Sequence, residues 1–335
     1  MKKCIYFIFS IFILCNACKK QNEDINYFSD VKKITEYDSI YSDKDNEVVG
    51  IIGLHKYQNT LIADNRTTDY LFSFYDIEKG VYLGSWGKRG QGPDDFLDAG
   101  GVAIVDSQLV FTDRMKKEII YVSIESVLNQ EENINVRRES YPYTAKFRPF
   151  HFSIMNNKKI ALGIFEKGRF GVLDTENNIM DCPSDYPFNY EEISGIYRGL
   201  AFQGKINSNI EQSKFVISTF CSDIFEIYQI TDAGIVRTYL SPFNHIPEIR
   251  ETPGRNSGYD IDRNKSIGGL VNMAVTNDLI YFVYTAKNDM EYYNSGRLSN
   301  EILCFDWDGK KIKKYILPIP VIASSFCVDN EYIYG

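Results

Sequence analysis

The amino-acid sequence predicts an all-β fold, a six-bladed β-propeller of four-stranded antiparallel blades. Short apolar runs recur through the chain with polar turn residues between them, and no amphipathic helix pattern separates the runs. Aromatic residues make up 14% of the chain, with 24 Tyr and 22 Phe, and such residues favour strands. Four short strands in each repeat, separated by turns, are typical of a propeller blade.

The clearest repeat is an apolar run that follows a polar turn, and its copies stand about 50 to 65 residues apart. The copies are LIADN at 61, LVFTD at 109, IALGI at 160, FVIST at 215, IYFVY at 280 and YIYG at 332. A further run follows the first five copies, as in YLFSFYDI, and a last one comes next, as in VYLGSW. One more run precedes the turn, as in GGVAIV, so the repeat predicts four strands.

The last repeat, VIASSFCVDNEYIYG, ends inside its second run. A closed ring leaves no exposed strand edge, so the missing outer strands have to come from another part of the chain. We expect the segment around Val31–Tyr37 to pair with the last blade. The alternative is that the sequence stops before the last blade is complete.

The first residues have the pattern of a secretory signal, because Lys2 and Lys3 precede the apolar run IYFIFSIFIL, which ends in CNAC. This run is too short to span the roughly 30 Å of hydrocarbon in a membrane. Ala17 followed by Cys18 resembles the lipobox of bacterial lipoproteins, in which the cysteine is acylated. The sequence therefore predicts a lipoprotein of the cell envelope.

This signal defines the expected domain organisation. Residues 1–17 form a signal peptide, Cys18 carries the lipid, residues 18–26 form a tether, and residues 27–335 form a single propeller domain. The lipid would anchor the protein to the outer membrane, facing either the periplasm or the outside. An ordinary secretory signal, with Cys18 incidental, is the alternative.

Charge excludes one class of partner. Residues 1–17 contain two lysines and no acidic residue, so their removal changes the formal net charge from −8 to −10. An acidic chain without a block of basic residues lacks the surface that neutralises phosphates, and we expect no nucleic-acid partner. The cysteines after Cys18 show no Cys-x-x-Cys spacing, which argues against a zinc site.

The most distinctive motif is SWGKRGQGPDDF, which contains three glycines. A phosphate-binding loop would lead into a helix and carry Lys-Ser/Thr after its last glycine. The residues that follow here, LDAGGVAIVDSQLVFTD, predict strands, so we expect no bound nucleotide. The motif instead predicts a structural corner between two blades, with glycines for positive φ, a proline that fixes φ, and an aromatic pin. Its residues are Gly90, Gly92, Pro93, Asp95 and Phe96.

The lipobox, the six repeats and above all GKRGQGPDDF resemble the six-bladed β-propeller lipoproteins of anaerobic Gram-negative gut bacteria, described as TolB-like or NHL-like. In that family a G-x-x-G-x-G-P-x-E/D-F corner follows the outer strand of an early blade, and residues 87–96 match it. The resemblance covers the mature chain. It implies a propeller fold and no particular activity.

The loops predict a ligand-binding site on one face of the ring. In a propeller, the crossovers between blades and the loops between second and third strands lie together around the central channel. Cationic and aromatic side chains there are suited to an anionic or polyhydroxylated ligand. The candidate ligand-binding residues are Arg66, Arg89, Arg114, Arg169, Arg263, Tyr292, Tyr293 and Arg297. The alternative is that these loop charges are solvated and paired locally.

Catalysis has little support in the sequence. His55, His151 and His245 fall in different repeats, where the first two are expected to pack in strands, and no Gly-x-Ser-x-Gly motif is present. We expect a non-catalytic binding or scaffold module without a cofactor, whose ligand is a glycan, a peptide or a partner protein. The alternative is a calcium-dependent hydrolase or lactonase with an axial metal site, for which Asn272 is a candidate ligand.

Overall fold

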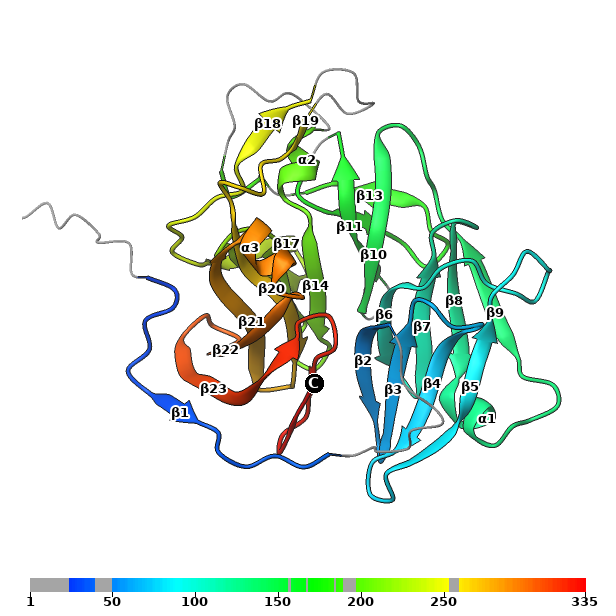
Figure 1. Ribbon diagram of the computed structural model, residues 1–335. Helices are drawn as coiled ribbons and strands as arrows, with labels where there is room; N and C mark the ends of the chain where they lie inside the picture. Colours follow the sequence, from blue (N-terminus) through cyan, green and yellow to red (C-terminus); the bar gives the residue numbers. More distant parts are fainter. Residues whose placement is uncertain are drawn as a thin grey trace, which may run out of the picture.

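The computed structural model describes residues 24–39, 50–155, 158–166, 168–183, 185–188, 197–252 and 259–335. Its strands form five antiparallel blades in sequence order, followed by a short two-stranded sheet in the sixth position. Figure 1 shows these sheets arranged around a common centre. The predicted all-β propeller of four-stranded antiparallel blades is confirmed, with five complete blades among the described residues.

The complete blades use four consecutive strands each. The first blade contains β2 (Ile51–Tyr57), β3 (Thr60–Asn65), β4 (Tyr70–Asp76) and β5 (Val81–Lys88). The second contains β6 (Gly100–Val105), β7 (Gln108–Asp113), β8 (Glu118–Ser123) and β9 (Val136–Ser140). The third contains β10 (Phe147–Met155), β11 (Lys158–Phe165), β12 (Gly171–Leu173) and β13 (Ile179–Asp181). The fourth contains β14 (Gly204–Asn209), β15 (Lys214–Thr219), β16 (Phe225–Thr231) and β17 (Gly234–Leu240). The fifth contains β20 (Ile267–Val275), β21 (Leu279–Asn288), β22 (Leu298–Asp306) and β23 (Lys311–Ile322).

Shorter elements lie beside the blades and between them. The additional strands are β1 (Val31–Lys33), β18 (Ile249–Glu251), β19 (Tyr259–Ile261), β24 (Cys327–Val328) and β25 (Ile333–Tyr334). The helices are α1 (Ile124–Leu128), α2 (Tyr197–Ala201) and α3 (Asp289–Asn294).

Apolar side chains fill the spaces between neighbouring blades. Between the first and second blades, the ring of Phe111 lies 5.1 Å from that of Phe72 and 5.4 Å from that of Phe96. Middle strands such as β8 contact other blades on both faces and are buried over most of their length, whereas the outer strand β5 is largely exposed. Burial on both faces explains why the second and third runs of the repeat are almost continuously apolar.

The ring closes between the sixth position and the first blade. The inner strands β2, β6, β10, β14, β20 and β24 each pack against the next, and β24 packs against β2. Cys327 and Tyr334 join the core cluster of Leu54, and Lys56 Nζ lies 3.1 Å from Asp329 Oδ2. Figure 1 shows the C-terminal end between β2 and the fifth blade. The short sheet β24–β25 therefore takes the place of a sixth blade in the ring.

The N-terminal segment joins the fifth blade. β1 pairs in parallel with β23, the outer strand of the fifth blade. The prediction that Val31–Tyr37 pairs with the sixth repeat is therefore wrong. The physical reason lies just before β1, where Ile25 and Phe28 are 1% and 7% exposed and join the core of the fourth and fifth blades. Burying two such side chains contributes about 1.5–3 kcal/mol each, which fixes the segment there.

The expected tether overlaps this packed segment, since Ile25 belongs to a core cluster although it precedes residue 27. The expected signal peptide and Cys18 lie outside the described residues. No helix in the described ranges is long and apolar enough to cross a membrane. The described cysteines, Cys182, Cys221, Cys304 and Cys327, are free thiols.

The glycine-rich motif forms the connection from β5 to β6. Phe96 is 2% exposed, and its ring lies 5.2 Å from that of Trp86. The Gly92 amide donates to Asp95 Oδ2 at 3.1 Å, and a Cβ atom at Gly90 would collide with the same carboxylate. Neither Gly90 nor Gly92 has a positive φ, so the close approach of Asp95 is what requires glycine at both positions.

Candidate functional site

One end of the ring carries the crossovers between blades and the loops between second and third strands. α2 lies in the crossover from the third to the fourth blade, β18 and β19 in the next crossover, and α3 between β21 and β22. Figure 1 shows β18, β19 and α2 at the top of the view, with α3 below them. We call this end of the molecule the crossover face.

Two of the predicted arginines hold loops of this face in place. Arg89 Nε donates to the carbonyl oxygen of Thr68 at 3.0 Å, and its Nη2 donates to the carbonyl oxygen of Asn65. Arg114 Nε donates to Asp98 Oδ2 at 2.5 Å, and this hydrogen bond raises the pKa of Arg114. Both guanidinium groups therefore have protein partners.

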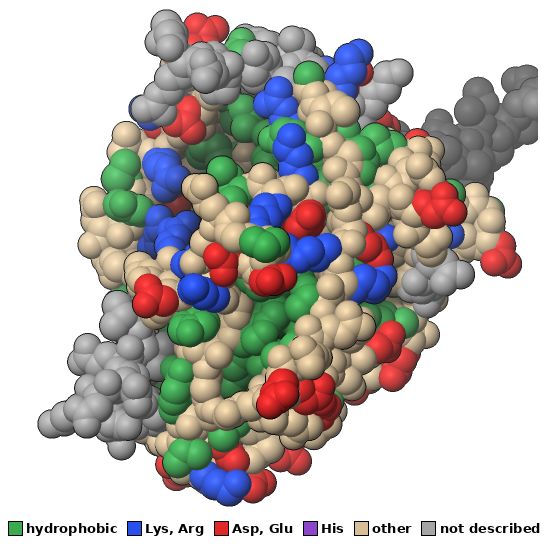
Figure 2. Space-filling view, turned by 90° about the vertical axis from the view of Figure 1, so that its right-hand side faces the viewer, with side chains coloured by type: hydrophobic (Ala, Val, Ile, Leu, Met, Phe, Trp, Pro, Cys, Tyr) green, Lys and Arg blue, Asp and Glu red, His purple; other side chains and the backbone are tan. Residues whose placement is uncertain are grey.

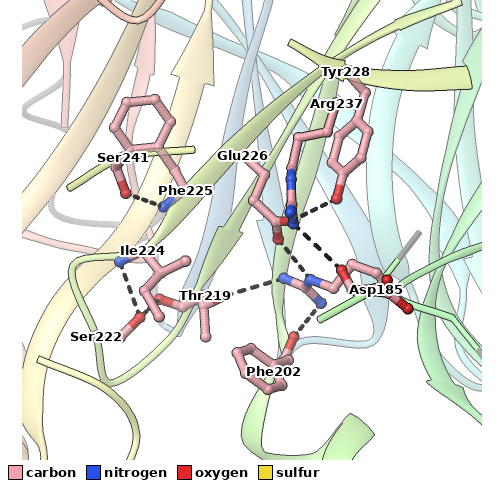
Figure 3. A network of polar contacts seen from close by, with 11 residues as sticks. Asp185, Phe202, Thr219, Ser222, Ile224, Phe225, Glu226, Tyr228, Arg237 and Ser241 are labelled. Atoms are coloured by element: carbon pink, nitrogen blue, oxygen red, sulfur yellow. Dashed lines mark hydrogen bonds and ion pairs between the residues drawn. The ribbon is translucent and has the colours of Figure 1, made fainter. Parts of the chain in front are cut away.

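Arg169 is not on the surface. Its side chain is 1% exposed and lies between the third and fourth blades, where its Nε donates to Glu226 Oε2 at 2.9 Å. It also donates to the carbonyl oxygen of Phe202 at 2.5 Å and to Thr219 Oγ1 at 3.1 Å. Figure 3 shows this network, in which Arg237 contacts the second oxygen of Glu226. Arg169 thus has a structural role between two blades.

The candidates around α3 do lie together. Tyr293 is half exposed, with the guanidinium of Arg297 4.9 Å and that of Arg263 6.0 Å from its ring centre. Arg263 Nη1 also lies 3.3 Å from Asp289 Oδ2. Tyr292 is 6% exposed and belongs to a core cluster of the fifth blade. Arg263, Tyr293 and Arg297 therefore form an exposed group at one side of the crossover face.

The remaining surface shows charges of both signs. Arg66 is exposed. Figure 2 views the molecule from the side of β5 and β9, where cationic and acidic side chains alternate. On β9, Arg138 Nη1 lies 3.0 Å from Glu118 Oε2, and Arg137 is paired with Glu139. Of the candidate arginines, Arg114 shows such local pairing, with Asp98, which is the alternative that the sequence left open.

A different group of polar side chains comes from the inner strands of three blades and from the strand next to one of them. His55 comes from β2, Asp64 from the end of β3, His151 from β10 and Lys205 from the start of β14. The charge of Lys205 lowers the pKa of His55, Asp64 and His151, so Lys205 in the fourth blade lies within electrostatic range of residues in the first and third blades. We call His55, Asp64, His151 and Lys205 the channel cluster.

The channel cluster has few protein partners. Within the described part of the chain, none of the four side chains makes a hydrogen bond or an ion pair with another protein group. The buried atoms Asp64 Oδ1 and His55 Nε2 are both unpartnered, and Asp64 is only 5% exposed. Buried polar groups are almost always hydrogen-bonded, so these atoms point to water or a ligand in the channel.

Burial perturbs the pKa of all four groups. It lowers the pKa of His55 to about 3 and that of His151 to about 4, and the positive charge of Lys205 acts in the same direction. It raises the pKa of Asp64 to about 7, although Arg89, Lys205 and Arg114 oppose this shift. It lowers the pKa of Lys205 to about 8, against the charge of Asp64. At neutral pH the cluster therefore contains two neutral imidazoles and one ammonium.

Two glycines of inner strands leave room for the imidazoles. A Cβ atom at Gly53 would lie 3.2 Å from His55 Nε2 and 3.3 Å from the Asp64 side chain. A Cβ atom at Gly101, where φ is 57°, would lie 3.2 Å from His151 Nδ1. A larger residue at either position would displace the imidazole ring next to it, so this arrangement of the rings requires glycine at both positions.

The axial calcium alternative depends on oxygen ligands. The described ranges contain no group of three His, Cys, Asp or Glu side chains arranged to hold a metal ion. Asn272 is 1% exposed, and its amide is engaged by the Met273 amide and by the carbonyl oxygen of Ala323. It therefore joins β20 to the crossover that leads toward β24.

Sequence reasoning treated His55 and His151 as packing residues and did not single out Lys205. The alternating pattern of a strand does not tell an inner strand, which lines the channel, from a middle strand. The available signal was the position of each residue in the repeat, since all but Asp64 lie in the first strand of a repeat, the strand nearest the axis.

Comparison with known proteins bears on the fold. A DUF4221-family protein from Bacteroides vulgatus has a TM-score of 0.57 at 12% identity, covering 87% of this chain and 88% of that chain. A Bacteroides fragilis protein described as a candidate exported protein has a TM-score of 0.48 at 13% identity, covering 82% and 74%. At 12% identity, the first of these structures shows the fold alone.

Sequence comparison gives the family. No curated protein matches the chain at a significant level. The family model described as TolB-like 6-blade propeller-like matches residues 52–331, which run from the second residue of β2 to beyond β24 and stop before β25. With this match and the ring of six inner strands, the chain belongs to the TolB-like six-bladed propeller-like family.

Proposed function

We propose that the protein is a non-catalytic binding module of the cell envelope that holds its ligand on the crossover face, at the opening of the central channel. The observation that carries this proposal is the channel cluster, in which side chains from three blades lie within electrostatic range of Lys205 and the buried atoms His55 Nε2 and Asp64 Oδ1 have no partner. Buried polar groups of this kind can bind water, and a ligand that reproduces the hydrogen bonds of a bound water can replace it.

Binding is favoured over catalysis by what surrounds the histidines. His245 Nδ1 lies 3.1 Å from Asp223 Oδ2, which resembles part of a catalytic triad. No described Ser, Thr or Cys side chain hydrogen-bonds to the other nitrogen of His245. Asp223 also accepts from the backbone amides of Asn244 and His245, so it shapes the crossover.

The ligand is a glycan, a peptide or a partner protein, and a glycan suits the channel cluster best because hydroxyl groups can both donate to and accept from neutral imidazoles. The test is a glycan array probed with the soluble form, residues 21 onward. We expect binding that is lost in the double variant His151→Leu, Lys205→Met and kept in Lys287→Met, an exposed lysine at the end of β21. Array binding that survives the double variant would place the ligand elsewhere, and an array without binding would contradict the glycan.

The membrane anchor is part of the same proposal. Cys18 should take up a fatty-acid analogue in cells, and Cys18→Ala should release the protein into the soluble fraction. Full labelling of Cys18→Ala would contradict the anchor.

The calcium-dependent alternative is separated by thermal melting. A metal well above its dissociation constant stabilises the folded state by a few kcal/mol. We expect the melting temperature to be the same with millimolar calcium and with a chelator, and a rise with calcium would favour the hydrolase.

A further inference from the structure

We propose that the channel cluster binds a small hydroxycarboxylate, with the carboxylate on Lys205 and the neighbouring hydroxyl groups on His55, His151 and Asp64. This inference rests on the proposed function, since it names the chemistry of the ligand at the same channel opening. It follows from the charge, the open hydrogen-bonding atoms and the acidity of the groups that face one another there.

The charge of the cluster calls for a monoanion. Three cations act on the cluster, and two of them are engaged: Arg89 by backbone carbonyl groups and Arg114 by Asp98. The ammonium of Lys205 has neither an ion pair nor a hydrogen bond within the described ranges. One open cation that is half buried among protein groups suits a single carboxylate, because charge-assisted hydrogen bonds are the strong ones.

The other three side chains call for hydroxyl groups. A neutral imidazole presents one donor and one acceptor, and His55 Nε2 is buried without a partner. Asp64 Oδ1 is also buried without a partner. A hydroxyl group can accept from one of these groups and donate to another, whereas an apolar ligand would leave them all unsatisfied.

Phosphate and sulfate fit the cluster less well. A dianion would bring a second negative charge close to Asp64, where one open cation faces it. Sulfate also has no hydrogen to donate to an imidazole nitrogen or to a carboxylate oxygen. The cluster therefore favours a ligand with one charge and several donors.

The pH dependence of binding follows from the groups that face the ligand. His55 and His151 stay neutral above about pH 5, and Arg114, whose pKa is raised by its hydrogen bond to Asp98, keeps its proton. As pH rises from 6 to 9, Asp64 gains a negative charge near pH 7 and Lys205 loses its proton near pH 8. Both changes weaken anion binding, so the affinity should fall more than tenfold between pH 6 and pH 9.

The experiment is calorimetric titration of the soluble form, residues 21 onward, with three probes at pH 6. D-glucuronate carries both the charge and the hydroxyl groups, acetate only the charge, and D-glucose only the hydroxyl groups. We expect glucuronate to bind at least tenfold more tightly than either of the others and than inorganic phosphate. Equal binding of acetate, tighter binding of phosphate, or no heat with glucuronate would each overturn the proposal.

Variants test the role of Lys205 directly. Lys205→Met should weaken glucuronate binding about 10- to 100-fold, the range expected for a lost hydrogen bond to a charged group. Lys205→Arg should bind and lose less affinity at pH 9, since arginine keeps its proton. Lys287→Met, the matched surface control, should bind within twofold of the unchanged protein. Equal affinity of Lys205→Met and the unchanged protein for glucuronate would show that Lys205 does not bind the carboxylate.

The two proposals can fail separately. Array binding to neutral glycans that is lost in His151→Leu, Lys205→Met, together with no glucuronate binding, would keep the binding function and overturn the carboxylate. Glucuronate binding that depends on Lys205, together with no binding on the glycan array, would support the hydroxycarboxylate as ligand and contradict a larger glycan.

Discussion

At the scale of single residues, arginines that look alike in the sequence have different roles. Arg114 lies half exposed against Asp98 at the surface of the second blade, whereas Arg169 is buried against Glu226 between the third and fourth blades. Sequence analysis grouped both as candidate ligand-binding residues. Burial separates them, because a buried pair cannot lose one member without leaving an uncompensated charge.

This difference predicts a stability contrast. Arg169→Met should lower the free energy of unfolding by about 3–5 kcal/mol, because Glu226 is left buried with fewer partners. Arg114→Ala should cost no more than about 1 kcal/mol, as is usual for an exposed ion pair. Denaturant unfolding of both variants checks this, and equal losses would contradict the assigned roles.

Asp64 predicts a pH-dependent stability. Its raised pKa means that the folded protein binds a proton more tightly than the unfolded chain does, so stability falls as pH rises from about 4 to 7. The amide of Asp64→Asn does not titrate. The melting temperature of Asp64→Asn should therefore exceed that of the unchanged protein by more at pH 8 than at pH 5. A constant difference would show that Asp64 has an ordinary pKa.

Sequence alone could predict Phe96 as a packing residue but could not predict the partners of Arg169. An aromatic side chain in a tight corner between two blades is most easily buried in the gap between them, where Phe96 lies. The partner of Arg169, Glu226, lies in the next blade, and which loop residue turns inward depends on how two blades pack. The channel cluster was missed for the same reason.

At the scale of elements, the connection from β5 to β6 is a packing device. Lys116, which lies between β7 and β8 of the next blade, also holds this connection. Its Nζ donates to the carbonyl oxygens of Gly92 (3.0 Å) and Asp95 (2.6 Å). Phe96 fills the space between β4 and β7. The predicted corner is therefore held by both neighbouring blades.

The corner predicts unequal effects of two substitutions. Phe96→Ala should cost about 3–5 kcal/mol of unfolding free energy, because it empties a buried site between two blades. Pro93→Ala, at an exposed position, should cost less than about 1 kcal/mol. Chemical denaturation measures both unfolding free energies. A large decrease for Pro93→Ala and none for Phe96→Ala would show that the proline, and not the buried ring, stabilises the corner.

The N-terminal segment predicts the effect of a truncation. A chain that starts at residue 36 loses Ile25, Phe28 and β1, which exposes the edge of β23 and part of the core of the fourth and fifth blades. It should melt at a lower temperature and aggregate, whereas a chain that starts at residue 24 should not. Equal melting temperatures of the two truncations would show that this packing contributes nothing.

At the scale of the whole molecule, ring closure brings distant residues to one axis. The repeat in the sequence predicted the blades, because hairpin turns and apolar runs are local signals. The place of the N-terminal strand was harder to predict, since β23 and the sixth repeat both offered an edge and only the burial of Phe28 beside Phe305 decides between them. The channel exists only once the ring has closed, so its residues carry no local signal.

The central claim is that the channel opening holds a hydroxycarboxylate. The most direct measurement is a crystal structure of the soluble form, residues 21 onward, grown at pH 6 with D-glucuronate. We predict a carboxylate oxygen about 2.7–2.9 Å from Lys205 Nζ, as in other charge-assisted hydrogen bonds, with sugar hydroxyl groups on His55 and His151. Glucuronate bound away from the axis, or Lys205 paired with a carboxylate of the protein, would contradict the claim.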